Sequence, residues 1–371
     1  MTELLADHTT FRIGGPARAW IEATTEAEIL DAVRSADAVG EPLLILSGGS
    51  NLLISDAGFD GTVLKIATRG LSAEGSFCEF DADVAWPEAS GTAPGPSGAL
   101  GAGAAACGGF LVTVAAGELW DDVVAYAVAN ELVGIEALSG IPGLAGSTPI
   151  QNVGAYGQEV SQTIWNVRTY DRRDRAVRTF ANADCGFSYR HSRFKAEPGR
   201  YVVLDVTLQL EQGPLSAPIR FGELARRLGI DGGGRAPLAQ VREAVLELRR
   251  GKGMVSDPAD HDTWSAGSFF TNPILDADAA AGLPEDAPRF PQPDGRVKSS
   301  AAWLIEHAGF GKGFGTPPAT LSTKHTLALT NRGGASASDV VALARTVRDG
   351  VRERFGVTLV PEPVLLGVTL D

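Results

Sequence analysis

One glycine-rich segment constrains the fold of this 371-residue chain more than any other part of its sequence. Residues 139–159 read "SGIPGLAGSTPIQNVGAYGQE" and set five glycines and two prolines among mostly apolar residues. A loop of this length in a compact domain is more often functional than idle. Its small side chains expose backbone N–H groups to an anion, and Ile150, Val153 and Tyr156 can flank a flat ring. A tight loop that only links two strands is the structural alternative.

The composition indicates a globular protein and argues against several classes of function. The net charge is −13, from 32 basic and 45 acidic residues, which opposes general binding to nucleic acid. The three cysteines contain no CxxC pair and the five histidines are scattered, so neither a disulfide framework nor a metal site is expected. The sequence begins without signal-peptide features, and no apolar run approaches the roughly 18 residues of a membrane-spanning helix. We therefore expect a cytoplasmic protein without membrane insertion.

The apolar periodicity predicts alternating helices and strands. Thr25 and Glu28 have the spacing of a capping box and predict a helix over residues 25–39. Residues 72–109 are acidic and then rich in proline, glycine and alanine, which predicts an irregular insertion. The remaining pattern predicts strands at 43–46, 61–66, 110–117, 163–171, 176–180 and 201–210, and helices at 118–130, 237–250 and 336–356.

Four polar features point to chemistry. The turn "SGGSNLL" (47–53) can approach a phosphate, although such a sequence by itself more often makes an ordinary turn. Arg190 can clamp a carboxylate with two hydrogen bonds, and a surface ion pair is its alternative role. Glu362 lies between two prolines in an apolar run, where a carboxylate needs a partner or serves acid–base chemistry. Ser268, in "SAGSFFTNP", packs in a tight apolar turn or reacts there.

These motifs together resemble one enzyme family, the UDP-N-acetylenolpyruvoylglucosamine reductases. The resemblance covers about residues 9 to 367 apart from the insertion, and the long glycine-rich loop and "GSFFTNP" are its most specific parts. The matching motifs are "TTFRIGGPA", "ILSGGSNLLI", "GIPGLAGSTPIQNVGAYGQE", "YRHSRFK", "GSFFTNP", "KSSAAWLIEHAGFGKG" and "LVPEPVLLG".

The resemblance implies an α+β chain with a vanillyl-alcohol-oxidase-type (PCMH-type) FAD-binding fold. Two α/β subdomains bind FAD, and a C-terminal α+β domain binds the substrate. The implied boundaries are 1–68 with 356–371 returning to it, 69–222 including the insertion at 72–109, and 223–355. In the implied reaction NADPH reduces FAD, and the reduced flavin reduces the enolpyruvyl double bond of a UDP-sugar to give UDP-N-acetylmuramate for peptidoglycan. A monomer is expected.

The resemblance also assigns roles to residues. Arg190 holds the substrate carboxylate, protonated Glu362 hydrogen-bonds to the developing enolate, and Ser268 donates the proton to C2. The FAD-binding residues are Gly48, Gly49, Ser50, Asn51, Leu52, Ser147, Thr148, Pro149, Ile150, Gln151, Asn152, Ala155 and Tyr156. The substrate-binding residues are Tyr189, Phe221, Lys252, Asn272, Lys298 and Lys312.

One position departs from the pattern of the long-loop (type I) subgroup. There a tyrosine precedes Gly-Asp or Gly-Glu, whereas "RFGEL" places Phe221 at this position, so stacking remains and the phenol hydrogen bond is lost. Two other functions stay open at this point. An FAD oxidase of the same wider fold needs no Ser268 and Glu362 in these contexts, and a non-catalytic UDP-sugar-binding module needs no flavin loop.

Overall fold

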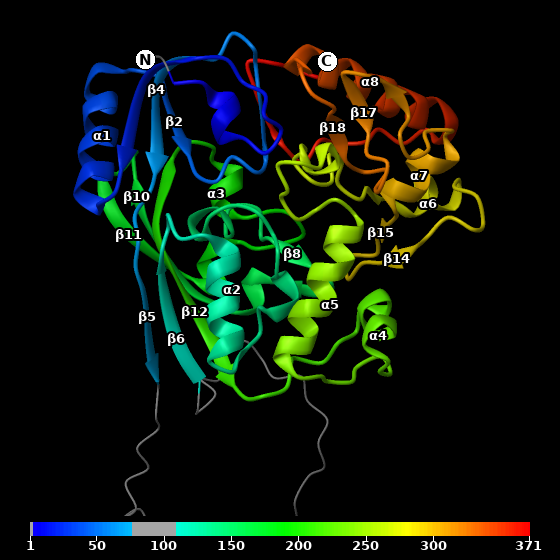
Figure 1. Cartoon of the computed structure of the whole chain (residues 1–371), viewed down its shortest axis with the longest axis horizontal. Coiled ribbons are helices and arrows are strands. Elements are labelled where there is room, and N and C mark those ends of the chain that lie inside the picture. Colours follow the sequence, from blue (N-terminus) through cyan, green and yellow to red (C-terminus); the bar gives the residue numbers. More distant parts are fainter. Residues whose placement is uncertain (1–2, 76–108) are drawn as a thin grey trace, which may run out of the picture.

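The N-terminal part of the molecule is a small parallel α/β unit (Figure 1). The computed structural model describes residues 3–75 and 109–371. Strands β1 (Ala17–Ala23), β4 (Phe59–Ile66) and β2 (Leu43–Leu46) form a parallel sheet in the order β1-β4-β2. Helix α1 (Glu26–Val39) connects β1 to β2. The predicted capping box is confirmed, because the Thr25 side chain accepts from the Glu28 N–H and Glu28 bonds back to the Thr25 N–H.

A larger antiparallel sheet forms the middle of the molecule. Its strands follow the order β11-β10-β12-β6-β5, and the short strand β7 also pairs with β12. Buried residues of this sheet, of α1 and of helix α2 share one core, so the first two units pack as one body. The elements are β5 (Leu71–Gly75), β6 (Gly109–Ala115), α2 (Trp120–Ala129), β7 (Leu132–Val133), β10 (Ile164–Asp171), β11 (Ala176–Ala181) and β12 (Tyr201–Gln212).

The predicted irregular insertion at 72–109 is wrong at both ends. Residues 72–75 belong to β5, and Gly109 begins β6, which pairs antiparallel with β5. Strand β5 is an edge strand whose residues 72–75 are exposed, so no alternation of buried and exposed residues marks it in the sequence. The rest of the insertion lies outside the described residues.

The C-terminal part is an α+β unit with its own core. Helix α8 (Ala337–Phe355) begins at a Ser336–Asp339 capping box, at the start of the predicted helix 336–356, and buries Val340, Val347 and Val351. Around it lie α6 (Ala277–Ala281), α7 (Ala301–His307), β13 (Ile274–Leu275), β14 (Phe290–Pro291), β15 (Val297–Lys298), β16 (Gly315–Thr316), β17 (Ala319–Leu321) and β18 (Leu329–Asn331). The chain before this unit also forms β8 (Gly154–Ala155), β9 (Gln158–Glu159), α3 (Arg193–Ala196), α4 (Gly222–Leu228) and α5 (Leu238–Gly251).

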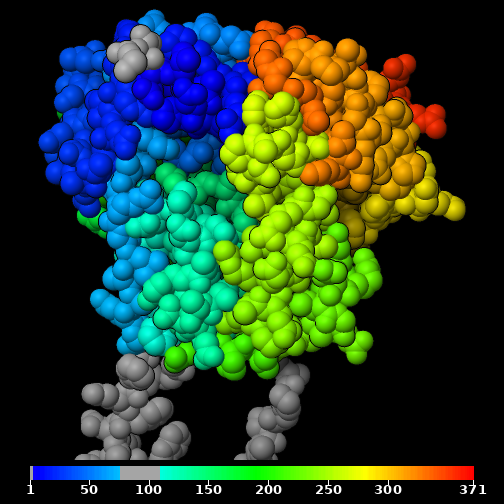
Figure 2. Space-filling view, in the orientation of Figure 1, coloured from blue at the N-terminus to red at the C-terminus, as the bar shows by residue number. Residues whose placement is uncertain are grey.

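The chain returns from the C-terminal unit to the N-terminal one. Strand β19 (Val364–Leu366) pairs in parallel with β3 (Leu52–Ile54). Phe11 and Leu53 from the N-terminal part are fully buried in the same core as Phe269 and Val347. The space-filling view shows the blue N-terminal residues directly beside orange C-terminal ones (Figure 2). Residues from both ends of the sequence therefore meet.

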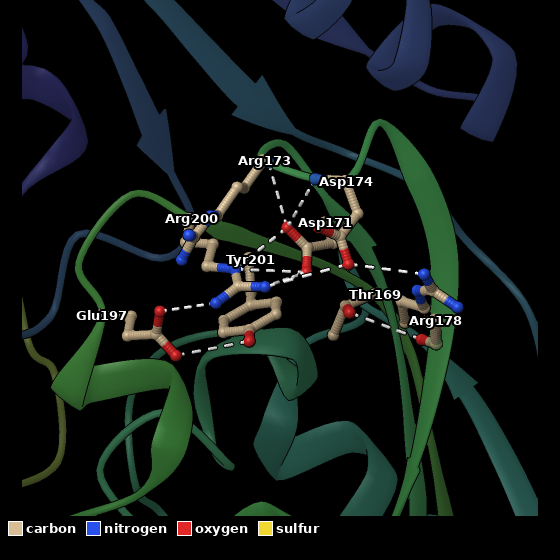
Figure 3. Close-up of polar contacts among 8 residues, drawn as sticks. All are labelled: Thr169, Asp171, Arg173, Asp174, Arg178, Glu197, Arg200 and Tyr201. Atoms are coloured by element: carbon tan, nitrogen blue, oxygen red, sulfur yellow. Dashed lines mark hydrogen bonds and ion pairs between the residues drawn. The ribbon is translucent and has the colours of Figure 1, made fainter.

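A buried ion pair fixes the loop before β12 (Figure 3). Asp171, at the end of β10, accepts hydrogen bonds from Arg200 Nε at 3.0 Å and Nη2 at 2.7 Å. Arg200 also bonds to Glu197 at 2.6 Å, and Arg172 donates to the Gly199 carbonyl at 2.8 Å. The loop over residues 197–200 is thus held at both its side chains and its backbone.

Candidate active site

A cavity of about 910 Å³ lies where the three parts of the chain meet. Its wall comes mainly from segments 43–52, 141–156, 190–199, 249–256, 263–268 and 362–366. The volume is at the upper end of the roughly 300–1,000 Å³ typical of small-molecule sites, and apolar surface dominates the wall. The cavity can therefore take a ligand of cofactor size together with a second molecule.

Two glycine-bearing loops form one side of the cavity by packing backbone against backbone. A Cβ atom on Gly48 would lie 2.5 Å from Gly143 Cα, and one on Gly49 would lie 1.8 Å from the His8 carbonyl oxygen. Gly49 also has a φ of +61°, in the left-handed region. Glycine is required at both positions because the backbone at Gly143 and at His8 leaves no room for a side chain.

Besides Arg190 Nε, two buried polar atoms of cavity-lining residues lack a hydrogen-bond partner in the described part of the chain. Ser47 Oγ and Arg249 Nε have no hydrogen-bond partner among the described residues, and both residues line the cavity. Burial lowers the pKa of Arg249 to about 10, so the guanidinium is charged at neutral pH. Buried polar groups are normally satisfied, so these atoms fit a polar or anionic ligand such as the flavin nucleotide that the sequence motifs imply.

Arg190 and Glu362 lie in contact at the cavity wall. Arg190 Nε lies 3.0 Å from Glu362 Oε1, and Gln151 Nε2 donates to the same oxygen at 3.4 Å. The Arg190 Nε–H is not aligned on that oxygen and has no hydrogen bond among the described residues. Asn51 connects the two sides, because its Nδ2 donates to Gln151 Oε1 at 2.8 Å and to the Glu362 carbonyl at 3.2 Å.

Backbone contacts hold Arg190 in an uncommon conformation. Its φ is +52°, and its Nη2 donates to the Gly154 carbonyl at 2.9 Å. Lys195 Nζ donates to the Arg190 carbonyl at 3.1 Å. A non-glycine residue at positive φ is strained, and these contacts on both its side chain and its carbonyl maintain it.

Burial favours the protonated form of Glu362. It raises the pKa of the Glu362 carboxyl, while the charges of Arg190 and Lys195 act in the opposite direction. A carboxyl whose pKa is raised in a cavity can donate a hydrogen bond that an ionised carboxylate cannot.

Ser268 lies on the same wall through a short run of backbone pairing. The Glu362 N–H donates to the Phe269 carbonyl at 2.8 Å, and the Phe269 N–H donates to the Leu327 carbonyl at 2.7 Å. Phe269 and Phe270 are buried in the C-terminal core, while Ser268 lines the cavity. The two phenylalanines therefore anchor the turn that presents the serine.

A group of charged residues lies at another part of the cavity. Lys252 Nζ lies 2.6 Å from Glu223 Oε2 and 5.7 Å from the centre of the Tyr156 ring. Burial and the charges of Lys252 and Lys312 lower the pKa of His325 to about 4, so its ring is neutral at pH 7. Lys252 and His325 both line the cavity.

Most of the residues singled out from the sequence line this cavity. They are Gly48, Gly49, Ser50, Asn51, Leu52, Ser147, Thr148, Ile150, Gln151, Ala155, Tyr156, Arg190, Phe221, Lys252, Ser268 and Glu362. The cavity wall does not include Pro149, Asn152, Tyr189, Asn272, Lys298 or Lys312.

Three of those other residues have clear contacts elsewhere. The Tyr189 ring lies 4.8 Å from Lys298 Nζ. Asn272 Oδ1 accepts from the Ala301 N–H at the start of α7. The ligand-binding roles of these residues stay predictions.

Sequence reasoning missed three ionisable residues of the wall, Lys195, Arg249 and His325. Lys195 is in the quoted "YRHSRFK" motif, where its side chain was not considered. Arg249 lies at the end of the predicted helix 237–250, where a basic residue suits the helix C-terminus, and His325 has no neighbour at metal-ligand spacing. No described group of three or more His, Cys, Asp or Glu side chains could hold a metal ion. Within residues 3–75 and 109–371, no helix has the length and apolar character needed to cross a membrane.

Comparisons with known proteins agree with this geometry. A family model described as an FAD binding domain matches residues 17–179, and one for the C-terminal domain of UDP-N-acetylenolpyruvoylglucosamine reductase matches residues 257–366. The chain is similar to the UDP-N-acetylenolpyruvoylglucosamine reductase of Cutibacterium acnes, with 58% identity over 99% of this chain and 90% of the relative. The enzyme of Streptomyces coelicolor is 56% identical over the same shares.

The solved structure of the Thermus caldophilus reductase has a TM-score of 0.62 and 24% identity, covering 99% of this chain and 98% of that one. Together with the FAD binding domain match, it confirms the predicted fold class. High identity over nearly the whole chain shows the family directly. The chain belongs to the UDP-N-acetylenolpyruvoylglucosamine reductase family.

Proposed function

We propose that Arg190, Glu362 and Ser268 are the catalytic residues of this reductase. As a member of its family, the chain uses FAD, with NADPH as reductant, to reduce UDP-N-acetylglucosamine enolpyruvate to UDP-N-acetylmuramate in peptidoglycan precursor synthesis. The observation that carries the catalytic proposal is the convergence of the three side chains on one cavity wall from distant segments. Family membership sets aside a different flavin oxidase and a non-catalytic binding module.

FAD, when bound and reduced by NADPH, would supply the hydride for the enolpyruvyl double bond. Negative charge then develops on C2 and the substrate carboxylate. Arg190 binds that carboxylate, and its unaligned Nε–H is available for the contact. Protonated Glu362 donates to the enolate oxygen, in keeping with its raised pKa. A preorganised donor of this kind is typically worth about 2.7–4 kcal/mol of transition-state stabilisation.

Ser268 donates the proton that C2 then needs. A hydroxyl is a weak acid in water, but a proton donor fixed beside a strongly basic carbon is worth roughly 10²–10⁴-fold in rate. Phe269 and Phe270 hold the turn that carries Ser268 in the C-terminal core.

A half-reaction experiment tests these assignments. We expect Ser268→Ala to bind FAD and to be reduced by NADPH, yet to form no UDP-N-acetylmuramate when the substrate is added anaerobically. Loss of FAD from this variant would instead show that the serine is structural. Normal product formation would remove Ser268 from the mechanism.

We also propose how the cavity is divided between its ligands. The glycine-bearing loops would hold FAD together with Ser47 and Arg249. The loops lack side chains that would keep a ligand away from their backbone, and the two residues have side-chain donors without a partner among the residues that the structure describes. Lys252, with Phe221 and Tyr156 beside it, would take the diphosphate side of the UDP-sugar. The same proposal places the chain in the long-loop (type I) subgroup, with Phe221 on the loop that closes over the substrate.

Three broader assignments complete the proposal. The boundaries at about residues 68, 222 and 355 divide the chain into two FAD-binding subdomains and a substrate domain, and the β3–β19 pairing supports the return of residues 356–371. We propose a monomer in the cytoplasm, where NADPH and UDP-sugars are supplied. Light scattering on the purified holoenzyme would test the monomer against a dimer.

A further inference from the structure

The short helix α4 is attached to the molecule at its edge (Figure 1). It packs against α5 through a small core that includes Leu224, Ala225, Val241 and Val245. This core is separate from the larger cores of the sheet and of the C-terminal unit. Gly229, at the C-terminus of α4, has a φ of +68° and no atom within 4 Å of a Cβ placed on it. Helix α4 is therefore held by few buried contacts.

The N-terminal end of α4 contacts two residues of the cavity wall. Phe221 meets the Tyr156 ring edge to face, with the centroids 5.4 Å apart. Glu223, on the first turn, reaches Lys252 at 2.6 Å. The cavity is lined by Phe221, Tyr156 and Lys252 but not by Glu223. A carboxylate from the edge of the molecule thus neutralises a lysine inside the site.

We infer that Glu223 is an internal counter-ion that competes with the substrate's diphosphate for Lys252. The inference rests on the proposed function, in which Lys252 binds that diphosphate. An ammonium group has three donors, so it can contact two anions, but a diphosphate beside Lys252 brings at least two further negative charges toward Glu223. The repulsion between the two anions displaces the carboxylate. The bound diphosphate then takes the place of Glu223 at Lys252, and this contact between α4 and the cavity wall is lost.

The surrounding charges support competition rather than shared binding. The His325 ring is neutral at pH 7, so it adds no positive charge to offset both anions. Lys312 is close enough for its charge to act on His325, and its charge favours the incoming diphosphate as well as Glu223. The Lys252–Glu223 pair is about one-third exposed, at 32% and 35% of the two side chains, so a ligand can reach it.

Binding of UDP to the holoenzyme tests this inference, because UDP carries the diphosphate and undergoes no reaction. We expect Glu223→Gln to bind UDP about two- to fivefold more tightly than wild type in calorimetry, the range of a partly exposed ion pair. The gain should shrink as salt is added, because screening weakens the pair in the wild-type protein.

Glu247→Gln is the matched control. Glu247 on α5 binds Arg227 on α4, with Arg227 Nε at 2.9 Å, so this variant also removes an ion pair that anchors α4. Glu247 is not in the cavity wall. We expect the UDP affinity of this variant to equal that of wild type. Equal tightening in Glu223→Gln and Glu247→Gln would overturn the inference, since looser packing of α4 would then explain both.

Lys252→Met separates the inference from the function on which it rests. Weaker UDP binding in Lys252→Met, combined with unchanged or weaker binding in Glu223→Gln, would overturn the counter-ion role while keeping the lysine in the diphosphate site. Weaker binding in Glu223→Gln would mean that the carboxylate positions Lys252. Unchanged binding in Lys252→Met would overturn the proposed diphosphate site itself.

Discussion

Replacing Glu362 distinguishes a proton-donating carboxyl from a merely structural one. The side chain lies beside Arg190 Nε and Gln151 Nε2, at 3.0 and 3.4 Å, and is largely buried. Glu362→Ala removes the donor and should slow reduction of the enolpyruvyl substrate by about 10²–10³-fold, equivalent to about 2.7–4 kcal/mol. Reduction of the flavin by NADPH should keep its rate, because no enolate forms in that half-reaction. Glu362→Gln retains a hydrogen-bond donor and should be the less impaired variant.

The pH dependence follows from the raised pKa of Glu362. In wild type, reduction of the substrate should slow as the pH rises through that raised pKa, because the donor ionises. The stabilising contribution of the protonated carboxyl is complete below the ordinary glutamate pKa and is lost over the same rise in pH. Glu362→Gln cannot ionise, so its rate should lack this decline. Its thermal midpoint should gain relative to wild type at the higher pH.

Anaerobic stopped-flow measurement of flavin absorbance separates the two half-reactions. FAD content and thermal midpoint of each variant show whether a rate loss reflects chemistry or folding. A decline with pH in Glu362→Gln that parallels wild type would refute the assignment of Glu362 as a protonated donor. Equal slowing of both half-reactions in Glu362→Ala would show that the residue maintains the structure of the cavity and has no specific role in reducing the substrate.

Three further variants test other parts of the structure. Arg190→Ala should slow reduction of the enolpyruvyl substrate much more than reduction by NADPH, and an unchanged rate with the substrate would reject its role. Phe221→Tyr should lower the KM for the UDP-sugar by roughly twofold to tenfold, the effect of one added hydrogen bond; an unchanged KM would show that the phenol finds no partner. Asp171→Asn should lower the thermal midpoint by several degrees, because it weakens the buried contacts with Arg200, whereas Asp174→Asn, at a side chain 42% exposed, should change it little. Arg200 lowers the pKa of Asp171. The difference in thermal midpoint between wild type and Asp171→Asn should therefore disappear as the pH falls through that lowered pKa. A difference independent of pH would contradict the ion-pair explanation.

Local signals predicted much of the fold. The capping boxes at Thr25 and Ser336 mark the starts of α1 and α8 correctly, because a cap depends on residues three positions apart. Strand β5 could not be recognised in this way. It is an edge strand with exposed side chains, and it exists because β6 offers it a pairing partner, which a local pattern does not encode.

Individual residues of the site could be predicted from the sequence, but their arrangement in space could not. The contexts of Glu362 and Arg190 single them out in the sequence, but their separation of 3.0 Å depends on how distant segments pack. The same limit explains the missed residues. The bond from Lys195 to the Arg190 carbonyl depends on the strained backbone at Arg190, and the unpartnered Arg249 is recognisable only once its burial is known.

The pairing of β19 with β3 also determines when during synthesis the enzyme can be completed. Asn51 and the Glu362 carbonyl are hydrogen-bonded across 311 sequence positions, so the ribosome makes one partner long before the other. Until β19 docks, the edge of β3 that it covers is unpaired, and the fully buried Leu53 has lost part of its surroundings. Such long-range pairing forms slowly, and an unpaired edge is open to association with other chains. A nascent chain therefore leaves this edge uncovered during translation, and it can close its cavity around a cofactor only after β19 has been synthesised.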